Sequence, residues 1–126
     1  MDRNTPVNFE IAKLLKEKGF DETTNDIYSD EELLTDRLLN YKNSEDITAL
    51  LSAPTIAEVC MWLYEKHGIW ITVDIDINGR FTYLLRKFNP KDKAWEVKNK
   101  LLISEYINSP TEAYEKAIKY VLTEIL

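Results

Sequence analysis

The fold of this chain is decided by one stretch, residues 69–88, which reads IWITVDIDINGRFTYLLRKF. Apolar and polar side chains alternate from Ile69 to Asp76, which is typical of a β-strand with one buried face. Asn78-Gly79 is a turn signal, and a second strand is expected near residues 80–88. The stretch therefore predicts two antiparallel strands joined by a hairpin.

The length of the hairpin loop decides which side chains of the second strand share the isoleucine face. A two-residue loop at Asn78-Gly79 would put there Thr82, Leu84 and Arg86. A three-residue loop, residues 77–79, would put there Phe81, Tyr83 and Leu85. Burying a charged arginine on an apolar face costs far more than burying an aromatic ring. We therefore expect the three-residue loop, with Gly79 as a left-handed bulge residue.

Amphipathic helices are predicted on both sides of these strands. Thr55 and Glu58 form a capping box that opens one helix, and His67-Gly68 ends it. The buried stripe of this helix consists of Ile56, Val59, Cys60 and Leu63. Another capping box with a proline, residues 109–112, opens the last helix. The core face of the last helix consists of Tyr114, Ala117, Ile118, Val121, Leu122 and Ile125.

The N-terminal third is predicted to contain one further helix, from about Pro6 to Lys18. Thr5 can cap it, and proline suits the first helical position because its missing N–H costs nothing there. Gly19 supplies the left-handed residue that ends the helix, and Phe20 is expected to fold back onto its last turn.

Two segments leave alternatives open. Residues 31–39 either form a short helix behind an Asp30 cap, with Leu34 and Leu38 facing inward, or belong to a long polar connection that covers residues 21–51. In residues 94–107, Trp95 and Val97 alternate as in a strand, and a helix is the weaker alternative.

These elements predict a single α+β domain over residues 1–126. Residues 52–126 follow the order helix–strand–strand–strand–helix, which predicts a two-layer core with two helices covering an antiparallel three-stranded sheet. Residues 1–51 add the first helix, at the side or edge, and the polar, acidic connection. Double-stranded-RNA-binding domains share this order at the level of the fold only. Their last helix starts with a basic cluster, whereas residues 110–113 here read PTEA, which argues against RNA binding.

The composition fits one globular domain. Of the 126 residues, 44% are hydrophobic and 30% are charged, which supports a core and argues against disorder. No apolar run approaches the roughly 20 residues that span a bilayer. The first residues lack the apolar region of a signal peptide, and the single cysteine cannot form an internal disulfide. A cytoplasmic location is therefore expected.

Charge is distributed unevenly along the chain. The net charge of −6 opposes general nucleic-acid binding. Residues 80–100, however, hold seven basic and two acidic residues, interleaved with aromatic side chains. This pattern gives four candidate nucleic-acid contacts: Arg80, Lys87, Lys91 and Lys93. Residues 21–36 hold seven acidic residues and no Lys or Arg, and they could pair with the basic stretch, mimic nucleic-acid charge or form a solvated face.

The sequence predicts no catalytic residue, no metal site and no cofactor. His67, the only histidine, falls at a helix end, where the helix dipole favours a cation. Cys60 falls on a buried stripe without a basic neighbour, so both residues are interpreted as structural. The acidic run lacks the glycine of a calcium loop, and Asp74 and Asp76 fit a solvated strand face. We therefore do not expect an enzyme.

The outer face of the hairpin is the candidate interface. It would present Trp70, Thr72, Thr82, Leu84 and Arg86. An exposed tryptophan beside leucine and arginine is the composition of an interaction hot spot. The alternative is that residues 21–51 of the same chain cover this face.

Three stretches, residues 7–20, 52–70 and 109–117, together resemble a family of small proteins encoded by phages and prophages of gut anaerobic bacteria. The resemblance covers roughly half of the chain and lies mainly on the three predicted helices. That family has no assigned activity and no catalytic residues to transfer. It implies a phage context and expression in the cytoplasm of an infected cell.

The sequence therefore favours a small protein-interaction module that binds a host or phage protein. Nucleic-acid binding through residues 80–100 is the first alternative. An acidic nucleic-acid mimic and an enzyme are the remaining ones. The oligomeric state and the partner are not indicated by any pattern in the chain.

Overall fold

The computed structural model describes residues 5–35, 41–45, 50–98 and 107–126, and its elements confirm the predicted α+β class. The α-helices are α1 (Phe9–Glu17), α2 (Ile56–His67) and α3 (Pro110–Tyr120). A 3₁₀ segment, η1 (Asn43–Glu45), and a π-helical segment, η2 (Val121–Ile125), accompany them. The strands are β1 (Asp26–Ser29), β2 (Glu32–Thr35), β3 (Leu50–Ser52), β4 (Ile69–Ile75), β5 (Phe81–Asn89) and β6 (Ala94–Val97).

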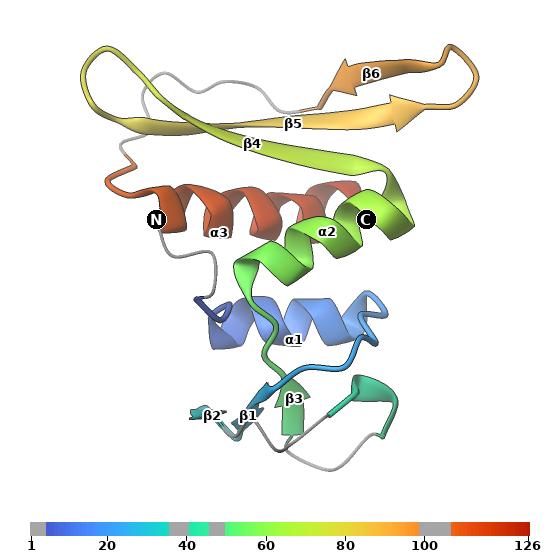
Figure 1. The fold of residues 1–126 in the computed structure, drawn as a ribbon, viewed down its shortest axis with the longest axis vertical. Coiled ribbons are helices and arrows are strands. Elements are labelled where there is room, and N and C mark those ends of the chain that lie inside the picture. The colour runs from blue at the N-terminus through green and yellow to red at the C-terminus, as the bar shows by residue number, and fades with distance from the viewer. Residues whose placement is uncertain (1–4, 36–40, 46–49, 99–106) are drawn as a thin grey trace.

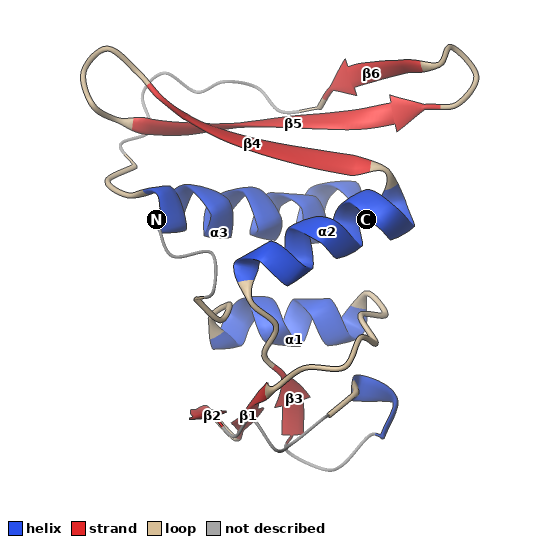
Figure 2. Ribbon diagram, in the orientation of Figure 1, coloured by secondary structure: helices blue, strands red, loops and turns tan. Residues whose placement is uncertain are grey.

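These elements are stacked in layers (Figure 1). The antiparallel sheet β4-β5-β6 lies over α2 and α3, as predicted. Below these helices lies α1, and below α1 lies a second antiparallel sheet with the order β2-β1-β3, so that the two sheets stand at opposite ends of the molecule (Figure 2). One hydrophobic cluster joins Leu15 of α1 through Leu63 of α2 to Leu85 of β5. No helix in the described ranges is long and apolar enough to cross a membrane.

The β4–β5 hairpin has the predicted register. Val73 lies opposite Tyr83, and Ile71 lies opposite Leu85, so the loop is the three-residue one. The carboxylate of Asp76 accepts from two backbone N–H groups across the loop, at 2.8 and 2.9 Å. These hydrogen bonds favour the ionised form and hold the pKa of Asp76 below its ordinary value. Gly79 has φ +78°, the left-handed conformation expected of a bulge residue.

The third strand resolves part of the ambiguous segment after the hairpin. β6 pairs with β5, with Trp95 opposite Phe88 and Val97 opposite Arg86. The alternation of Trp95 and Val97 is therefore that of a strand. Residues 99–106, the rest of this segment, lie outside the described residues.

The helices that cover this sheet begin largely as predicted. In α2, the Thr55 hydroxyl accepts from the Glu58 N–H at 3.2 Å, and the Glu58 carboxylate accepts from the Thr55 N–H at 3.1 Å. In α3, the Ser109 hydroxyl accepts from the Glu112 N–H at 3.1 Å. The carboxylate of Glu112, however, accepts from Asn108, the residue before the cap, so only half of the predicted box forms.

The first helix starts later than predicted. Asn8 caps α1, with its side-chain oxygen accepting from the Ile11 N–H at 2.9 Å, and Thr5 and Pro6 precede the helix. The reason is tertiary: Pro6 forms a bridge with Thr55, and the Val7 N–H donates to the Pro54 carbonyl at 2.9 Å. The chain is therefore held extended at the position where sequence alone favoured a first helical turn.

The helix ends as expected. Gly19 has φ +88°, and the Phe20 N–H donates to the Leu15 carbonyl at 2.9 Å. This is the hydrogen bond of a glycine-terminated helix, and it turns the buried Phe20 back toward the core.

The second sheet corrects the prediction for residues 21–51. The described part of this segment contains three short strands, and a helix over residues 31–39 is wrong. Asp30, with φ +53°, and Glu31 form a tight turn instead, and Leu34 pairs with Ile27 across the β1–β2 hairpin. Aspartate tolerates the left-handed conformation that this turn requires. Leu38 lies outside the described residues.

This sheet also changes the place of the first helix. α1 does not lie at the side or edge of the main sheet, as expected, but between the helix layer and β3 (Figure 1). Ile27 and Tyr28 of β1 are buried, and the Tyr28 hydroxyl donates to the Val7 carbonyl at 2.7 Å. This hydrogen bond thereby attaches the small sheet to the chain segment that precedes α1.

Candidate interaction surface

The five residues predicted for the interface share the outer face of the main sheet. Trp70 lies opposite Arg86, Thr72 lies opposite Leu84, and Thr82 lies opposite Asp74. The exposed fraction of Trp70 is 45%, and the other four side chains are half-buried. The described strands of residues 21–51 form the small sheet at the opposite end of the molecule (Figure 1), and Glu22, Thr23 and Lys42 lie beside α2 without lining a pocket with Trp70. The alternative that this segment covers Trp70 therefore does not hold for the described residues.

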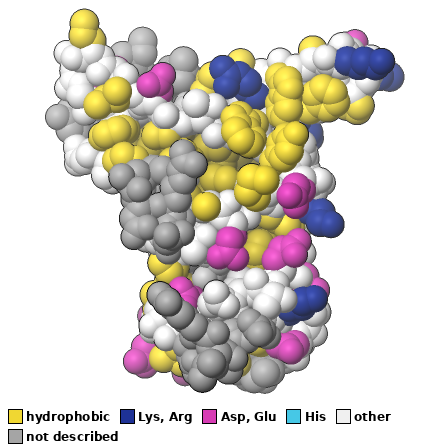
Figure 3. Space-filling view, in the orientation of Figure 1, with side chains coloured by type: hydrophobic (Ala, Val, Ile, Leu, Met, Phe, Trp, Pro, Cys, Tyr) yellow, Lys and Arg dark blue, Asp and Glu magenta, His cyan; other side chains and the backbone are white. Residues whose placement is uncertain are grey.

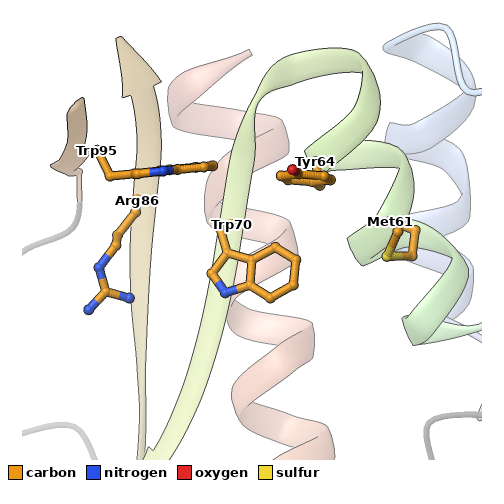
Figure 4. A pocket seen from close by; sticks show the side chains of 5 residues that line it. All are labelled: Met61, Tyr64, Trp70, Arg86 and Trp95. Carbon is orange, nitrogen blue, oxygen red and sulfur yellow. The ribbon is translucent and has the colours of Figure 1, made fainter. Parts of the chain in front are cut away.

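Around Trp70, large side chains from four elements converge on one depression. We call it the aromatic groove; it has a volume of about 500 Å³ and is lined by Met61, Tyr64, Trp70, Arg86 and Trp95 (Figure 4). Met61 and Tyr64 come from α2, Trp70 from β4, Arg86 from β5 and Trp95 from β6. Figure 3 shows hydrophobic side chains gathered on this side of the molecule, over α2 and the main sheet.

The rings of the groove hold one another in fixed orientations. Tyr64 meets Trp70 nearly perpendicularly, with ring centroids 5.5 Å apart and an interplanar angle of 78°. Tyr64 and Trp95 are nearly parallel, at 12°, with centroids 6.3 Å apart, and lie side by side in Figure 4. Phe88 supports Trp95 from the neighbouring strand at 5.4 Å. The surface is therefore pre-arranged, although each of these side chains is more than one-third exposed.

Two local features of the sequence place these residues. Gly68, with φ +63°, reverses the chain directly between α2 and β4, so Tyr64 in the last turn of α2 reaches Trp70 near the start of the strand. The register of β5 and β6 places Trp95 on the same face as Phe88 and Arg86. On that face, the Arg86 guanidinium donates to the Thr72 hydroxyl at 3.2 Å, which holds it beside Trp70.

Met61 and Tyr64 were not predicted from the sequence. The pattern predicted one apolar stripe on α2, and Trp62 is buried on that side as well. Ala57, Met61 and Tyr64 recur at helical spacing and form a second apolar stripe. Met61 and Tyr64 line the aromatic groove, and Ala57 lines a neighbouring depression between α2 and β4. A helix that is apolar on two faces is the signal that could have revealed them.

The four candidate nucleic-acid contacts are not brought together. Arg80 pairs with Asp76 beside the β4–β5 loop, at 3.1 Å. Lys91 and Lys93 lie in the β5–β6 turn, at the other end of β5, about 26 Å away for a nine-residue strand. Lys87 lies opposite Ile69 and so belongs to the inner face of the sheet. No single basic patch forms from them.

The acidic run does not lie along the basic stretch. Most of its described residues lie in and around β1 and β2, and Asp21 and Glu22 line a depression with Lys66 and His67 of α2, whereas residues 80–98 lie in the main sheet (Figure 1). Pairing between the two stretches therefore does not occur among the described residues. Two basic side chains of this region instead pair with acidic side chains close by in the sequence, Arg80 with Asp76 and Lys98 with Glu96, both at 3.1 Å.

Comparisons of this chain with protein-family models, with curated proteins and with solved structures find no match. Any role of the aromatic groove therefore has to be inferred from its own chemistry.

Within the described part of the chain, no three His, Cys, Asp or Glu side chains are grouped so that they could hold a metal ion. His67 lies against the Trp62 ring, with centroids 4.8 Å apart, and its Nε2 atom is buried without a described hydrogen-bond partner. Burial, and to a smaller degree the charge of Lys87, lowers the pKa of His67. Desolvation acts in the opposite direction to the helix dipole, which favours the charged form.

This lowered pKa predicts a pH-dependent stability. Below the ordinary histidine pKa of about 6.5, the unfolded chain binds a proton that the folded chain still excludes. The free energy of unfolding is therefore expected to fall as the pH is lowered from 7 toward 5, in the range of about two pH units around the histidine pKa. His67→Phe, which keeps a ring against Trp62, should flatten this dependence in urea titrations at several pH values. An unchanged pH dependence in the variant would contradict the assignment to His67.

Proposed function

We propose that this protein is an interaction module that binds a partner protein through the aromatic groove. The observation that carries the proposal is the convergence of Tyr64, Trp70 and Trp95 with Met61 around one open depression. Aromatic residues, methionine and arginine are the side chains enriched at protein interfaces, and tryptophan is the commonest hot-spot residue. An apolar group of this kind marks a binding surface when it is exposed on a folded domain.

The partner that we propose is a host or phage protein in the cytoplasm of an infected cell, in keeping with the resemblance to phage-encoded proteins. Nucleic acid is disfavoured as the ligand for two reasons. The net charge is −6, and Arg86 is the one basic side chain that lines the described groove, where it already bonds Thr72. Binding to a phosphate backbone rewards several converging cations.

The test is to replace Trp70 by alanine and to compare partner binding with that of the wild type. Removal of a hot-spot tryptophan typically costs 2 kcal/mol or more, so we expect the affinity to fall by at least about 30-fold. The partner would be isolated by affinity purification from infected cells and its affinity measured by titration calorimetry. Because Trp70 is almost half exposed, the thermal midpoint should change little.

Ile77→Ala is the matched control. Ile77 is also a large apolar side chain, 99% exposed in the β4–β5 loop, and it does not line the groove. Its replacement should leave the affinity unchanged. Equal binding by the wild type and by both Trp70→Ala and Tyr64→Ala would overturn the proposal. Recovery of nucleic acid alone, with binding that falls steeply as salt rises, would overturn it in favour of the alternative.

A further inference from the structure

The main sheet has an open edge at β4. In the part of the chain that the structure describes, β4 pairs with β5 and with no other strand. The Phe88 N–H donates to the Gly68 carbonyl at 2.9 Å, and the Asp76 N–H donates to the Arg80 carbonyl at 2.8 Å. In an antiparallel pair such bonds recur at every second residue, so the even-numbered residues of β4 turn their backbone groups toward β5. The backbone N–H and carbonyl groups of Ile71, Val73 and Ile75 therefore point away from β5, toward the edge of the sheet.

Only the middle of this edge is unpaired among the described residues. At one end, the outward N–H of Ile75 already donates to the Asp74 carboxylate at 2.9 Å. At the other end, the Tyr64 ring packs against Trp70. Between them, the outward N–H and carbonyl groups of Ile71 and Val73 have no partner among the described residues. Such groups form a template on which another strand can pair.

An apolar groove runs beside this free stretch. It lies between α2 and β4, has a volume of about 160 Å³, and is lined among others by Ala57, Cys60, Ile71 and Tyr114. It shares Met61 and Trp70 with the aromatic groove, so the two depressions are continuous. A row of hydrogen-bonding groups and a row of apolar side chains thus lie next to each other along β4.

We infer that the partner presents an extended peptide segment, which adds to the β4 edge as a further strand and lies between β4 and α2. This inference rests on the proposed function and specifies how the partner is held. The backbone of the peptide would pair with Ile71 and Val73, and every second side chain would enter the apolar groove. The intervening side chains would face away from α2. A helical segment fits less well because its backbone groups are already paired and cannot use the open edge.

A second copy of this chain is a poorer occupant of the same edge. In a symmetric antiparallel pair centred on Val73, Ile75 of one copy would lie opposite Ile71 of the other, and in one centred on Thr72 it would lie opposite Ile69. The N–H of Ile75 is already taken by Asp74 in each copy, so two hydrogen bonds of the new pair would be lost. A short peptide can end beside Val73 and avoid this loss.

The first test uses displayed random linear peptides, selected for binding to the full wild-type chain. We expect the selected peptides to carry apolar side chains at alternate positions. Their binding should shift the amide resonances of Ile71 and Val73 and slow the hydrogen exchange of these amides. Methylation of the peptide nitrogens that face β4 should lower the affinity about fivefold or more each, and methylation of the intervening nitrogens should not. Uniform tolerance of methylation, unaffected β4 amides or a selection without any binder would each overturn the inference.

The second test removes the outward N–H itself. Val73→Pro deletes this donor and keeps the hydrogen bonds between β4 and β5, a position at which proline is tolerated in edge strands. Val73→Ala is the control because it keeps the N–H. We expect Val73→Pro to lower the peptide affinity about fivefold or more relative to Val73→Ala. If the proline variant does not fold, peptide methylation still decides the question.

The two proposals fail in different ways. Binding that is weakened by Trp70→Ala, but not by Val73→Pro or by peptide methylation, would overturn strand addition and leave the protein-interaction function standing. Binding that is also unaffected by both Trp70→Ala and Tyr64→Ala would overturn both proposals. Self-association of the wild type that Val73→Pro abolishes, without peptide binding, would show that a second copy occupies the edge and would overturn the inference.

Discussion

Replacing Leu85 by alanine is expected to lower the free energy of unfolding by about 2–5 kcal/mol, which is enough to unfold a marginally stable domain of this size. Leu85 is fully buried and belongs to the hydrophobic cluster between the sheet and the helices. Truncation of this side chain deletes apolar contacts and leaves a cavity that the close-packed neighbouring side chains cannot fill. Urea denaturation, followed by the fluorescence of the tryptophans, measures the loss.

The adjacent residue provides a matched control. Leu84 has the same side chain on the same strand, but it lies on the outer face, opposite Thr72, and stays half-buried. Leu84→Ala should therefore cost less than about 1 kcal/mol. The contrast also tests the hairpin loop, because a two-residue loop would exchange the faces of the two leucines. A larger loss for Leu84→Ala than for Leu85→Ala would contradict the register.

Replacing Asn43 by alanine is expected to have a comparable effect, for a polar reason. Asn43 is buried, its side-chain NH₂ donates to the Phe20 carbonyl at 2.9 Å, and its side-chain oxygen accepts from the Ser52 N–H at 3.0 Å. One side chain thus joins the end of α1 to β3. Alanine would leave two buried backbone groups unpaired, at about 1–3 kcal/mol each, so we expect a total loss of about 2–6 kcal/mol.

Asn25→Ala is the control for this prediction, because Asn25 is exposed in the turn before β1. It should change the free energy of unfolding by less than about 0.5 kcal/mol. Denaturation midpoints of the two variants measure the difference, provided that the slope of the free energy of unfolding against denaturant concentration is the same for both. Equal, small effects would show that Asn43 does not hold the small sheet in place.

The surface residues could be predicted from the sequence only in part. Trp70 and Arg86 follow from strand alternation and from the cost of burying an arginine, and the structure places them opposite each other on the outer face. Met61 and Tyr64 belong to a second apolar stripe of α2, and the helical pattern alone does not show which of the two stripes faces the core. The approach of Tyr64 to Trp95, 31 positions later in the chain, depends on the packing of α2 against β4 and cannot be seen in any local pattern.

The sequence by itself determined the α+β class, the three-residue hairpin, and the helices α2 and α3, because each rests on short-range periodicity, turn chemistry or capping. Tertiary structure alone decided the small sheet and the late start of α1. The sheet is held by distant polar contacts, such as those of Asn43, and Pro6 is drawn into an extended bridge with Thr55. Such contacts join residues far apart in the chain, and their hydrogen bonds override local propensity without leaving a periodic trace in the sequence.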